Sequence, residues 1–339
     1  MKRLVIPLII IIFLLFILIP VFLINEKREL PEKVEIVIER GRACSYVLNE
    51  LREKNLIKHR FILHFLLKIS GKSKGIKAGE YEFEGRISDI DVLKKILKGE
   101  VKKYPLTIPE GSNIYQIAKM VYRVCPPDNF LSLAMSPDIA RRYGINSSSL
   151  EGFLFPDTYL FEKSDNCERV IDTMVKRFFK EWSPEFRERA EEIGMSMEEV
   201  ITLASIIEKE AKVKEEAPLI SAVFHNRLKK NMFLQADPTV IYGLLPEFDG
   251  NLKKEHLKTP GPYNTYRRKG LPPTPICNPG KNAIYSALYP AQVPYLYFVS
   301  KNDGTHVFTT TLKEHNYYVE IYQKRGQRRS GNKEGRNRK

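Results

Sequence analysis

The longest uninterrupted apolar segment of the chain runs from Leu4 to Ile24, close to its N-terminus. As an α-helix, a segment of this length would extend about 31 Å, enough to span the hydrocarbon core of a bilayer. A cleaved signal peptide would have a shorter apolar stretch that ends in small residues. Here the segment leads from Phe22 directly to Asn25 and Glu26, without such a cleavage site. We therefore predict a single-pass anchor in the cell membrane over residues 4–24, with residues 1–3 as a cytoplasmic stub and all other residues outside the cytoplasm.

The formal charge of +14 is unevenly distributed along the chain. Residues 324–339 carry eight Lys or Arg and one Glu, a composition typical of a disordered basic tail. Anionic lipid, an acidic wall polymer or nucleic acid could also bind such a tail. A nucleic-acid partner is disfavoured, because the predicted anchor leaves no cytoplasmic domain.

The cysteines are too widely spaced to indicate a metal site or a redox dithiol. They are Cys44, Cys125, Cys167 and Cys277. Disulfides can form outside the cytoplasm, but the sequence does not show which cysteines would pair.

The apolar patterning downstream of the anchor predicts an α+β fold with two parts. Residues 34–105 alternate short strand patterns with helical spacings, and Ser45 and Ser112 each follow a Gly turn as candidate helix N-caps. This small α+β module could be a spacer or a glycan-binding module. Residues 106–323 form a larger, mainly helical part, in which 151–159 predict a packed loop and 295–299 a buried strand.

One predicted helix places a carboxylic acid on its apolar face. Ser196 and Glu199 form a capping box at its start. At 100° per residue, Glu210 falls within the apolar stripe around Leu203, whereas Glu208 and Ser205 fall away from it. An apolar environment favours the neutral form of a carboxylic acid, as a general acid near neutral pH requires. Alternatively, Glu210 could bend out to solvent or pair with a buried Arg.

Several multi-residue motifs, in one order along nearly the whole chain except the tail, closely resemble the MltG (YceG-like) endolytic murein transglycosylases. They are LASIIEKE (203–210), VFHNRL (223–228), LQADPTVIYG (234–243), EG (151–152), FPDT (155–158), YNTY (263–266), GLPP (270–273), NPG (278–280), PYLYFV (294–299), His306 with Phe308, and His315-Asn316. The anchor agrees with this family too. One departure is Ala211, where relatives often have Thr or Ser beside the catalytic Glu.

The resemblance implies a membrane-anchored lyase with a LysM-like module at 34–105 and a YceG-like catalytic domain at 106–323. It implies cleavage of the β-1,4 bond between N-acetylmuramic acid (MurNAc) and N-acetylglucosamine (GlcNAc) inside peptidoglycan strands, leaving 1,6-anhydroMurNAc ends. The family's catalytic Glu corresponds to Glu210, which would protonate the leaving oxygen and then deprotonate the C6 hydroxyl. The implied partners are glycan strands and the membrane, with peptidoglycan synthases as further candidates.

Polar residues after the predicted catalytic helix are candidates for sugar contacts. They are Asn226, Gln235, Asp237, Thr239, Asn264, Tyr266 and Asn278. Each could instead stabilise a loop, as Asp-Pro and Asn-Pro sequences often do. His306 and His315 could line the cleft, but without a third ligand they do not indicate a metal site, and no cofactor is expected.

Two other functions remain open from the sequence. A hydrolytic muramidase could use Glu210 as acid and Asp237 to position water. A non-catalytic scaffold could bind the wall through its module and its anchor.

Overall fold

The computed structural model describes residues 15–16, 18–163 and 165–324. They form two compact units: unit 1 comprises the described residues up to Pro105 together with the segment from Leu160 to Asp165, and unit 2 comprises the rest. Within these ranges no helix is both long and apolar enough to cross a bilayer. Residues 1–14 and 17, which include most of the predicted anchor, and residues 325–339 of the predicted tail lie outside the described residues.

Unit 1 is built around two antiparallel strand pairs. Strand β2 (Val34–Ile38) pairs with β3 (Gly79–Phe83), and β1 (Arg28–Glu29) pairs with β4 (Arg86–Ile87). Ile36 of β2 pairs with Tyr81 of β3. Alternate residues of a strand point to the same face, and on the face that carries Ile36 and Tyr81 both side chains are buried.

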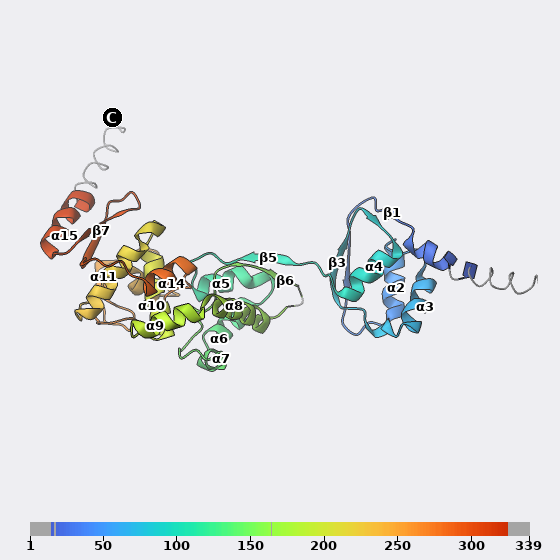
Figure 1. Cartoon of the computed structure of the whole chain (residues 1–339), viewed down its shortest axis with the longest axis horizontal. Coiled ribbons are helices and arrows are strands. Elements are labelled where there is room, and N and C mark those ends of the chain that lie inside the picture. The colour runs from blue at the N-terminus through green and yellow to red at the C-terminus, as the bar shows by residue number, and fades with distance from the viewer. Residues whose placement is uncertain (1–14, 17, 164, 325–339) are drawn as a thin grey trace, which may run out of the picture. The chain divides into compact units, whose positions relative to one another are not determined.

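Three helices supply most of the remaining core of unit 1 (Figure 1). They are α2 (Cys44–Glu53), α3 (Arg60–Ile69), which a short 3-10 turn η1 (Lys72–Lys74) follows, and α4 (Asp89–Lys98). Helix α2 begins after Ala43, which makes no side-chain cap, so the predicted N-cap at Ser45 is wrong. The buried Asp89 forms an ion pair with Arg28 and accepts backbone hydrogen bonds from Lys58 and His59, which fixes the start of α3.

The chain then continues through a mainly helical unit 2. Its elements are β5 (Tyr104–Thr107), which begins in unit 1, α5 (Ile114–Met120), η2 (Val121–Arg123), α6 (Pro127–Ala134), α7 (Pro137–Arg142), β6 (Thr158–Phe161), α8 (Cys167–Glu181), α9 (Pro184–Glu192), α10 (Met197–Glu210), η3 (Lys214–Glu216), α11 (Ala217–Lys229), α12 (Asp237–Gly243), α13 (Lys254–Lys258), α14 (Lys281–Leu288), β7 (Tyr297–Ser300), β8 (His306–Thr309), α15 (Leu312–Val319) and the π-helical η4 (Glu320–Lys324). Strand β5 pairs with β6, and β7 pairs with β8. The predicted mixed α+β fold is confirmed.

Helix α10 lies at the centre of unit 2, in contact with α9, α11, α12 and α14 (Figure 1). The predicted capping box of Ser196 and Glu199 is confirmed. Every residue from Val200 to Ile207 is buried, so this part of α10 has no solvent-facing side. Ser205, which the helical wheel placed off the apolar stripe, is buried as well. Its hydroxyl is satisfied there, because it donates to the Thr202 carbonyl and accepts from the amide of Ile276.

Two predicted details of unit 2 differ from the structure. Asn113, and not Ser112, caps α5, because the Asn113 side chain accepts from the Gln116 amide. Strand β7 is not buried throughout: Val299 alone among its four residues is buried, because β7 forms a two-stranded sheet with β8 at the edge of the unit.

A disulfide joins Cys125 to Cys167, and it links the turn before α6 to the first residue of α8. Cys44 and Cys277 are free thiols. The bridge closes a loop with a sequence separation of 42 residues.

Candidate active site

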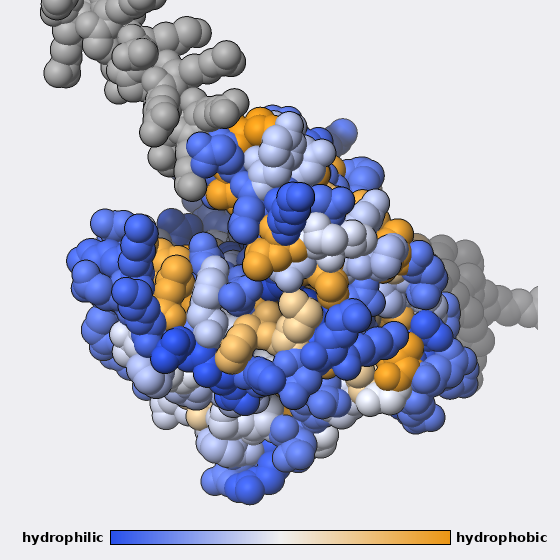
Figure 2. Space-filling view, turned by 90° about the vertical axis from the view of Figure 1, so that its left-hand side faces the viewer, coloured by the Kyte–Doolittle hydropathy of each residue, from blue (hydrophilic) through white to orange (hydrophobic). Residues whose placement is uncertain are grey.

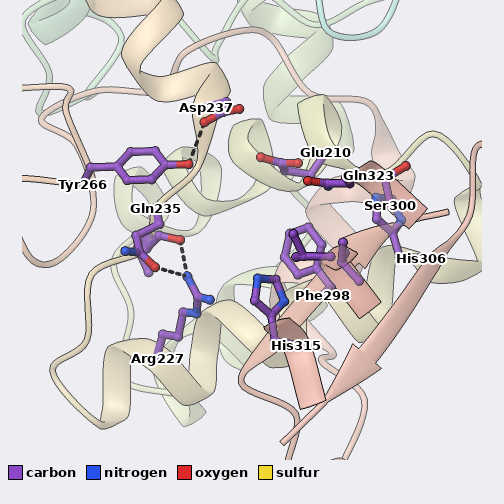
Figure 3. A pocket seen from close by; sticks show the side chains of 13 residues that line it. Glu210, Arg227, Gln235, Asp237, Tyr266, Phe298, Ser300, His306, His315 and Gln323 are labelled. Atoms are coloured by element: carbon purple, nitrogen blue, oxygen red, sulfur yellow. Dashed lines mark hydrogen bonds between the residues drawn. The ribbon is translucent and has the colours of Figure 1, made fainter. Parts of the chain in front are cut away.

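Glu210, the last residue of α10, lines a pocket of about 390 Å³. The other lining residues come from segments that follow α10 in the sequence. They are Arg227, Leu234, Gln235, Asp237, Tyr266, Phe298, Val299, Ser300, His306, His315, Val319 and Gln323. Figure 3 shows that the labelled side chains surround one space, with Glu210 at its edge.

The two glutamates at the end of α10 have different surroundings. Residues two apart on a helix point in nearly opposite directions. Glu208 accepts a 3.0 Å hydrogen bond from the amide of Gly280, so its carboxylate holds the loop that precedes α14. Glu210 is partly buried and lines the pocket. Of the two carboxylates, Glu210 is therefore the one placed to meet a ligand.

The surroundings of Glu210 raise its pKa to about 7. Removal from water is the largest cause, the negative charge of Asp237 adds to it, and the positive charge of Arg227 opposes it. The position of Glu210 at the C-terminal end of α10 acts in the same direction, because the last carbonyls of a helix disfavour a nearby anion. Glu210 can therefore hold or release a proton near neutral pH.

The pocket is less apolar than the helical wheel predicted. Polar side chains of Gln235, Asp237 and Tyr266 share it with Leu234 and Phe298. The raised pKa of Glu210 thus comes from burial together with a neighbouring negative charge, and not from an apolar wall alone.

Arg227 lines the pocket, but among the described residues no ion pair joins it to Glu210. Its guanidinium donates instead to the backbone carbonyls of Leu296, at 2.7 Å, and Leu234, also at 2.7 Å. Figure 3 shows Arg227 beside Gln235. The alternative of Glu210 neutralised by a buried Arg therefore does not hold in this structure.

Three of the predicted sugar-binding residues lie in the pocket with Glu210, namely Gln235, Asp237 and Tyr266. The Tyr266 hydroxyl donates a 2.6 Å hydrogen bond to Asp237 (Figure 3). Gln235 has a left-handed backbone, with a φ of 53°, immediately before the turn that leads into α12. These three residues can hydrogen-bond a ligand that reaches Glu210.

The structure places the other four predicted contacts in backbone-holding positions outside the pocket lining. Asn226 donates to the carbonyls of Val293 and Tyr295, and Thr239 donates to the carbonyl of Ala236. Asn264 donates to the carbonyls of His256, Leu257 and Thr259. Asn278 donates to the Ser112 carbonyl and the Glu151 carboxylate, and it accepts from the Leu154 amide. Thr239 and Asn278 are fully buried, and Asn264 nearly so. These four residues stabilise the backbone of unit 2 and do not face the pocket.

The opposite wall of the pocket comes from β7, β8 and the helical segment after them. It contributes Ser300, His306, His315 and Gln323. His306 is fixed by Glu216, which accepts hydrogen bonds from its Nδ1 at 2.7 Å and from its backbone amide at 3.0 Å. Figure 2 shows this end of the molecule, where hydrophilic side chains predominate. Such a surface suits a polar ligand.

Another glutamate, Glu151, is fully buried in unit 2 and does not line the pocket. Glu151 has no solvent exposure, and it accepts hydrogen bonds from the Ile114 amide and the Asn278 side chain. Burial raises the pKa of Glu151 to about 8. The adjacent Gly152 has a φ of 91°, and a Cβ there would lie 2.4 Å from Pro275. The predicted packed loop at 151–159 is thus fitted closely to the core.

Comparison with known proteins gives a family for this arrangement. The model of the YceG-like family matches residues 36–321. The chain belongs to the YceG-like family. The resemblance seen in the sequence motifs is thereby confirmed.

Two curated relatives of this YceG-like chain share a name. The endolytic murein transglycosylase of Bacillus subtilis (strain 168) is 34% identical over 307 residues, covering 85% of this chain and 84% of the relative. The endolytic murein transglycosylase of Streptococcus pneumoniae serotype 2 (strain D39) is 29% identical over 319 residues, and the match covers 84% of this chain but 58% of the relative. A crystal structure of a YceG-like protein from Listeria monocytogenes aligns with a TM-score of 0.58 and 33% identity, covering 84% of this chain and 98% of that one.

Sequence reasoning did not nominate several pocket residues of this YceG-like chain. Arg227 carried a signal, since a charged residue stands beside the apolar face of α11 within the motif VFHNRL. Ser300 and Gln323 carried none, because their contact with the pocket depends on how β7 and η4 fold back towards α10. His306 and His315 do line the pocket, as expected.

Proposed function

We propose that this chain is an endolytic murein transglycosylase, which cleaves the MurNAc-β-1,4-GlcNAc bond within glycan strands and leaves 1,6-anhydroMurNAc ends. The observation that carries the proposal is Glu210, a carboxylic acid with a pKa of about 7 in a polar pocket. The names of the bacterial relatives support the same activity. Such a lyase would terminate or trim nascent strands.

In the proposed reaction Glu210 first acts as an acid and then as a base. The protonated carboxyl gives its proton to the glycosidic oxygen, and the bond from that oxygen to C1 of MurNAc breaks. The N-acetyl group of the substrate stabilises the positive charge that develops at C1. The C6 hydroxyl then attacks C1, and its proton returns to Glu210, which restores the enzyme without water. A single group can perform both steps because its pKa lies near neutral pH.

The neighbours of Glu210 have roles in binding and in tuning. Gln235 and Tyr266 can bind sugar hydroxyl or acetamido groups, and Asp237 keeps the pKa of Glu210 raised through its charge. The proposed reaction uses side chains alone, without a cofactor.

We further propose that the chain is a single-pass protein of the cell membrane with its catalytic domain outside the cytoplasm. The apolar segment at residues 4–24 supports an anchor, and the Cys125–Cys167 disulfide is in keeping with an oxidising compartment. Residues 34–105 would form a LysM-like module that binds glycan, and peptidoglycan synthases would be partners.

Product analysis of digested glycan strands tests the catalytic proposal. Mass spectrometry should show anhydro ends with the wild-type chain and no cleavage with Glu210→Gln, which keeps the size of the side chain. Reducing ends would instead support a hydrolytic muramidase in which Asp237 positions water. Unaltered cleavage by a correctly folded Glu210→Gln chain would remove Glu210 from the mechanism, and a wild-type chain that binds strands without cutting them would indicate a scaffold.

A further inference from the structure

We propose that helix α3 of unit 1 lies in the headgroup region of an anionic lipid bilayer, with Phe61, Phe65 and Ile69 inserted at the boundary of the acyl chains. Unit 1 would then contact the membrane directly and would not merely be tethered to it. This inference rests on the proposed membrane anchor and goes beyond it.

Helix α3 has two apolar faces, and one of them is not used by the fold. Leu63 and Leu67 are buried in the core of unit 1. Phe61, Phe65 and Ile69 are 69%, 62% and 64% exposed. Residues four apart on a helix lie side by side, so these three form one continuous stripe. A contiguous row of large, exposed apolar side chains such as this one marks an interaction surface.

The stripe is continuous with the end of the predicted anchor. Residues 18–25 are helical, and Pro20, Val21 and Ile24 line an apolar groove together with Phe61, Phe65 and Ile69 of the stripe. Ile24 is buried in the core of unit 1, so this helix is fixed beside α3 (Figure 1). If residues 4–24 span a bilayer, the stripe lies where the chain leaves it.

The positive charge around α3 favours anionic lipid. From Lys54 to Gly79 the sequence contains seven Lys or Arg and no Asp or Glu. Lys68, Lys72 and Lys74 are exposed near the end of α3 and in η1. Aromatic side chains on one face and basic ones beside them are typical of helices that bind anionic membrane surfaces. A two-fold contact between two copies would bring this basic segment against itself, so a second copy is a poorer occupant.

Depth-dependent fluorescence quenching tests the contact with the full-length chain in phosphatidylglycerol vesicles. The single tryptophan, Trp182, is first replaced by Phe to remove its emission. Phe65→Trp then reports on the stripe. Val37→Trp is the matched control, because Val37 is 55% exposed on β2 of the same unit and is not part of the groove. In Figure 1 the strand β3, which pairs with β2, lies on the opposite side of unit 1 from α3.

We expect brominated lipid to quench most of the Phe65→Trp emission and little of the Val37→Trp emission. An interfacial helix inserts about 5–10 Å, so bromine near the headgroup end of the acyl chain should quench more than bromine near its methyl end. Quenching should weaken in neutral phosphatidylcholine vesicles.

Four other results would overturn the inference. Equal quenching at both positions would mean that the stripe has no preferential contact with lipid. Blue-shifted Phe65→Trp emission that lipid bromine does not quench would mean that no lipid covers the stripe, and it would indicate a protein partner or a second copy. A chain that sediments with vesicles but shows no quenching refutes the α3 contact alone. A chain that does not sediment with vesicles refutes the anchor and the contact together, whereas glycan cleavage, assayed separately, reports on the enzymatic proposal.

Discussion

The hydroxyl of Tyr266 donates a 2.6 Å hydrogen bond to Asp237, and both residues line the pocket of Glu210. This bond holds a negative charge at the place where it raises the pKa of Glu210. The charge and the hydrogen bond can be removed separately, because the charge belongs to the Asp237 carboxylate and the donor of the hydrogen bond is the Tyr266 hydroxyl.

Asp237→Asn should shift the alkaline limb of the activity profile to lower pH. In the proposed mechanism activity requires protonated Glu210, so it should fall as pH rises through the pKa of that residue, about 7. Without the charge of Asp237 that pKa falls, and a shift of about one pH unit or less is expected. The pH dependence of kcat/KM measures it. Tyr266→Phe, which keeps the charge, is the control, and an equal downward shift in that variant would contradict this account.

Gln235→Ala and Asn226→Ala should affect different properties. Gln235 lines the pocket, so its loss should raise KM for glycan strands. Asn226 donates to two backbone carbonyls, so its loss should lower the free energy of unfolding by about 1–3 kcal/mol with KM little changed. Denaturant titration and steady-state kinetics of both variants separate the two effects. A rise in KM confined to Asn226→Ala would reverse the assignment.

The chain should lose stability as pH rises from weakly acidic to weakly alkaline. The pKa of Glu151 is about 8 in the folded chain, above its ordinary value of 4.5, so the folded state retains a proton that the unfolded state releases in this window. Its contribution is complete below pH 4.5 and is lost as pH rises through about 8. The slope from this group is at most about 1.4 kcal/mol per pH unit.

Glu151→Ala tests this origin, with urea unfolding measured across the pH range. The variant should be less stable at acidic pH, because the Ile114 amide and the Asn278 side chain lose their acceptor, and its stability should fall less steeply with pH. A slope identical to that of the wild type would assign the dependence to other groups, of which Glu210 is the first candidate.

Reduction of the Cys125–Cys167 disulfide should lower the free energy of unfolding by about 2–4 kcal/mol, because the bridge restricts the unfolded chain. Thermal unfolding with and without reductant measures this loss. In the denatured, unreduced chain, thiol labelling should modify Cys44 and Cys277 only. Labelling of all four cysteines would show that the bridge does not form.

The sequence predicted the helix that carries the site better than it predicted the walls of the pocket. Local signals fix α10, since the capping box of Ser196 and Glu199 sets its start and the run from Val200 to Ile207 gives it a core position. Glu210 could therefore be nominated from spacing alone. Burial of α10 on all sides from Val200 to Ile207 could not be foreseen, because it depends on α14 and the Pro-rich loop before it, which follow much later in the chain.

Polar residues were harder to assign than helices. Asn226 and Gln235 are both polar residues in motif segments after α10, yet one holds the backbone and the other faces the pocket. Their difference depends on which carbonyls lie within reach after folding. Periodicity reports which face of a helix is apolar, but it does not report the hydrogen-bond partners of a buried amide.

The tight fit of Gly152 against Pro275 has a consequence for how such a site can diversify. A methyl group there would meet Pro275 at 2.4 Å and Ile201 of α10 at 2.8 Å, so position 152 tolerates no larger residue without a shift of its neighbours. Helix α15, which contributes His315 to the pocket lining, has no buried residue. Differences among relatives in their preference for glycan strands should therefore accumulate on β7, β8 and α15, where a new side chain alters the lining of the pocket without disturbing α10.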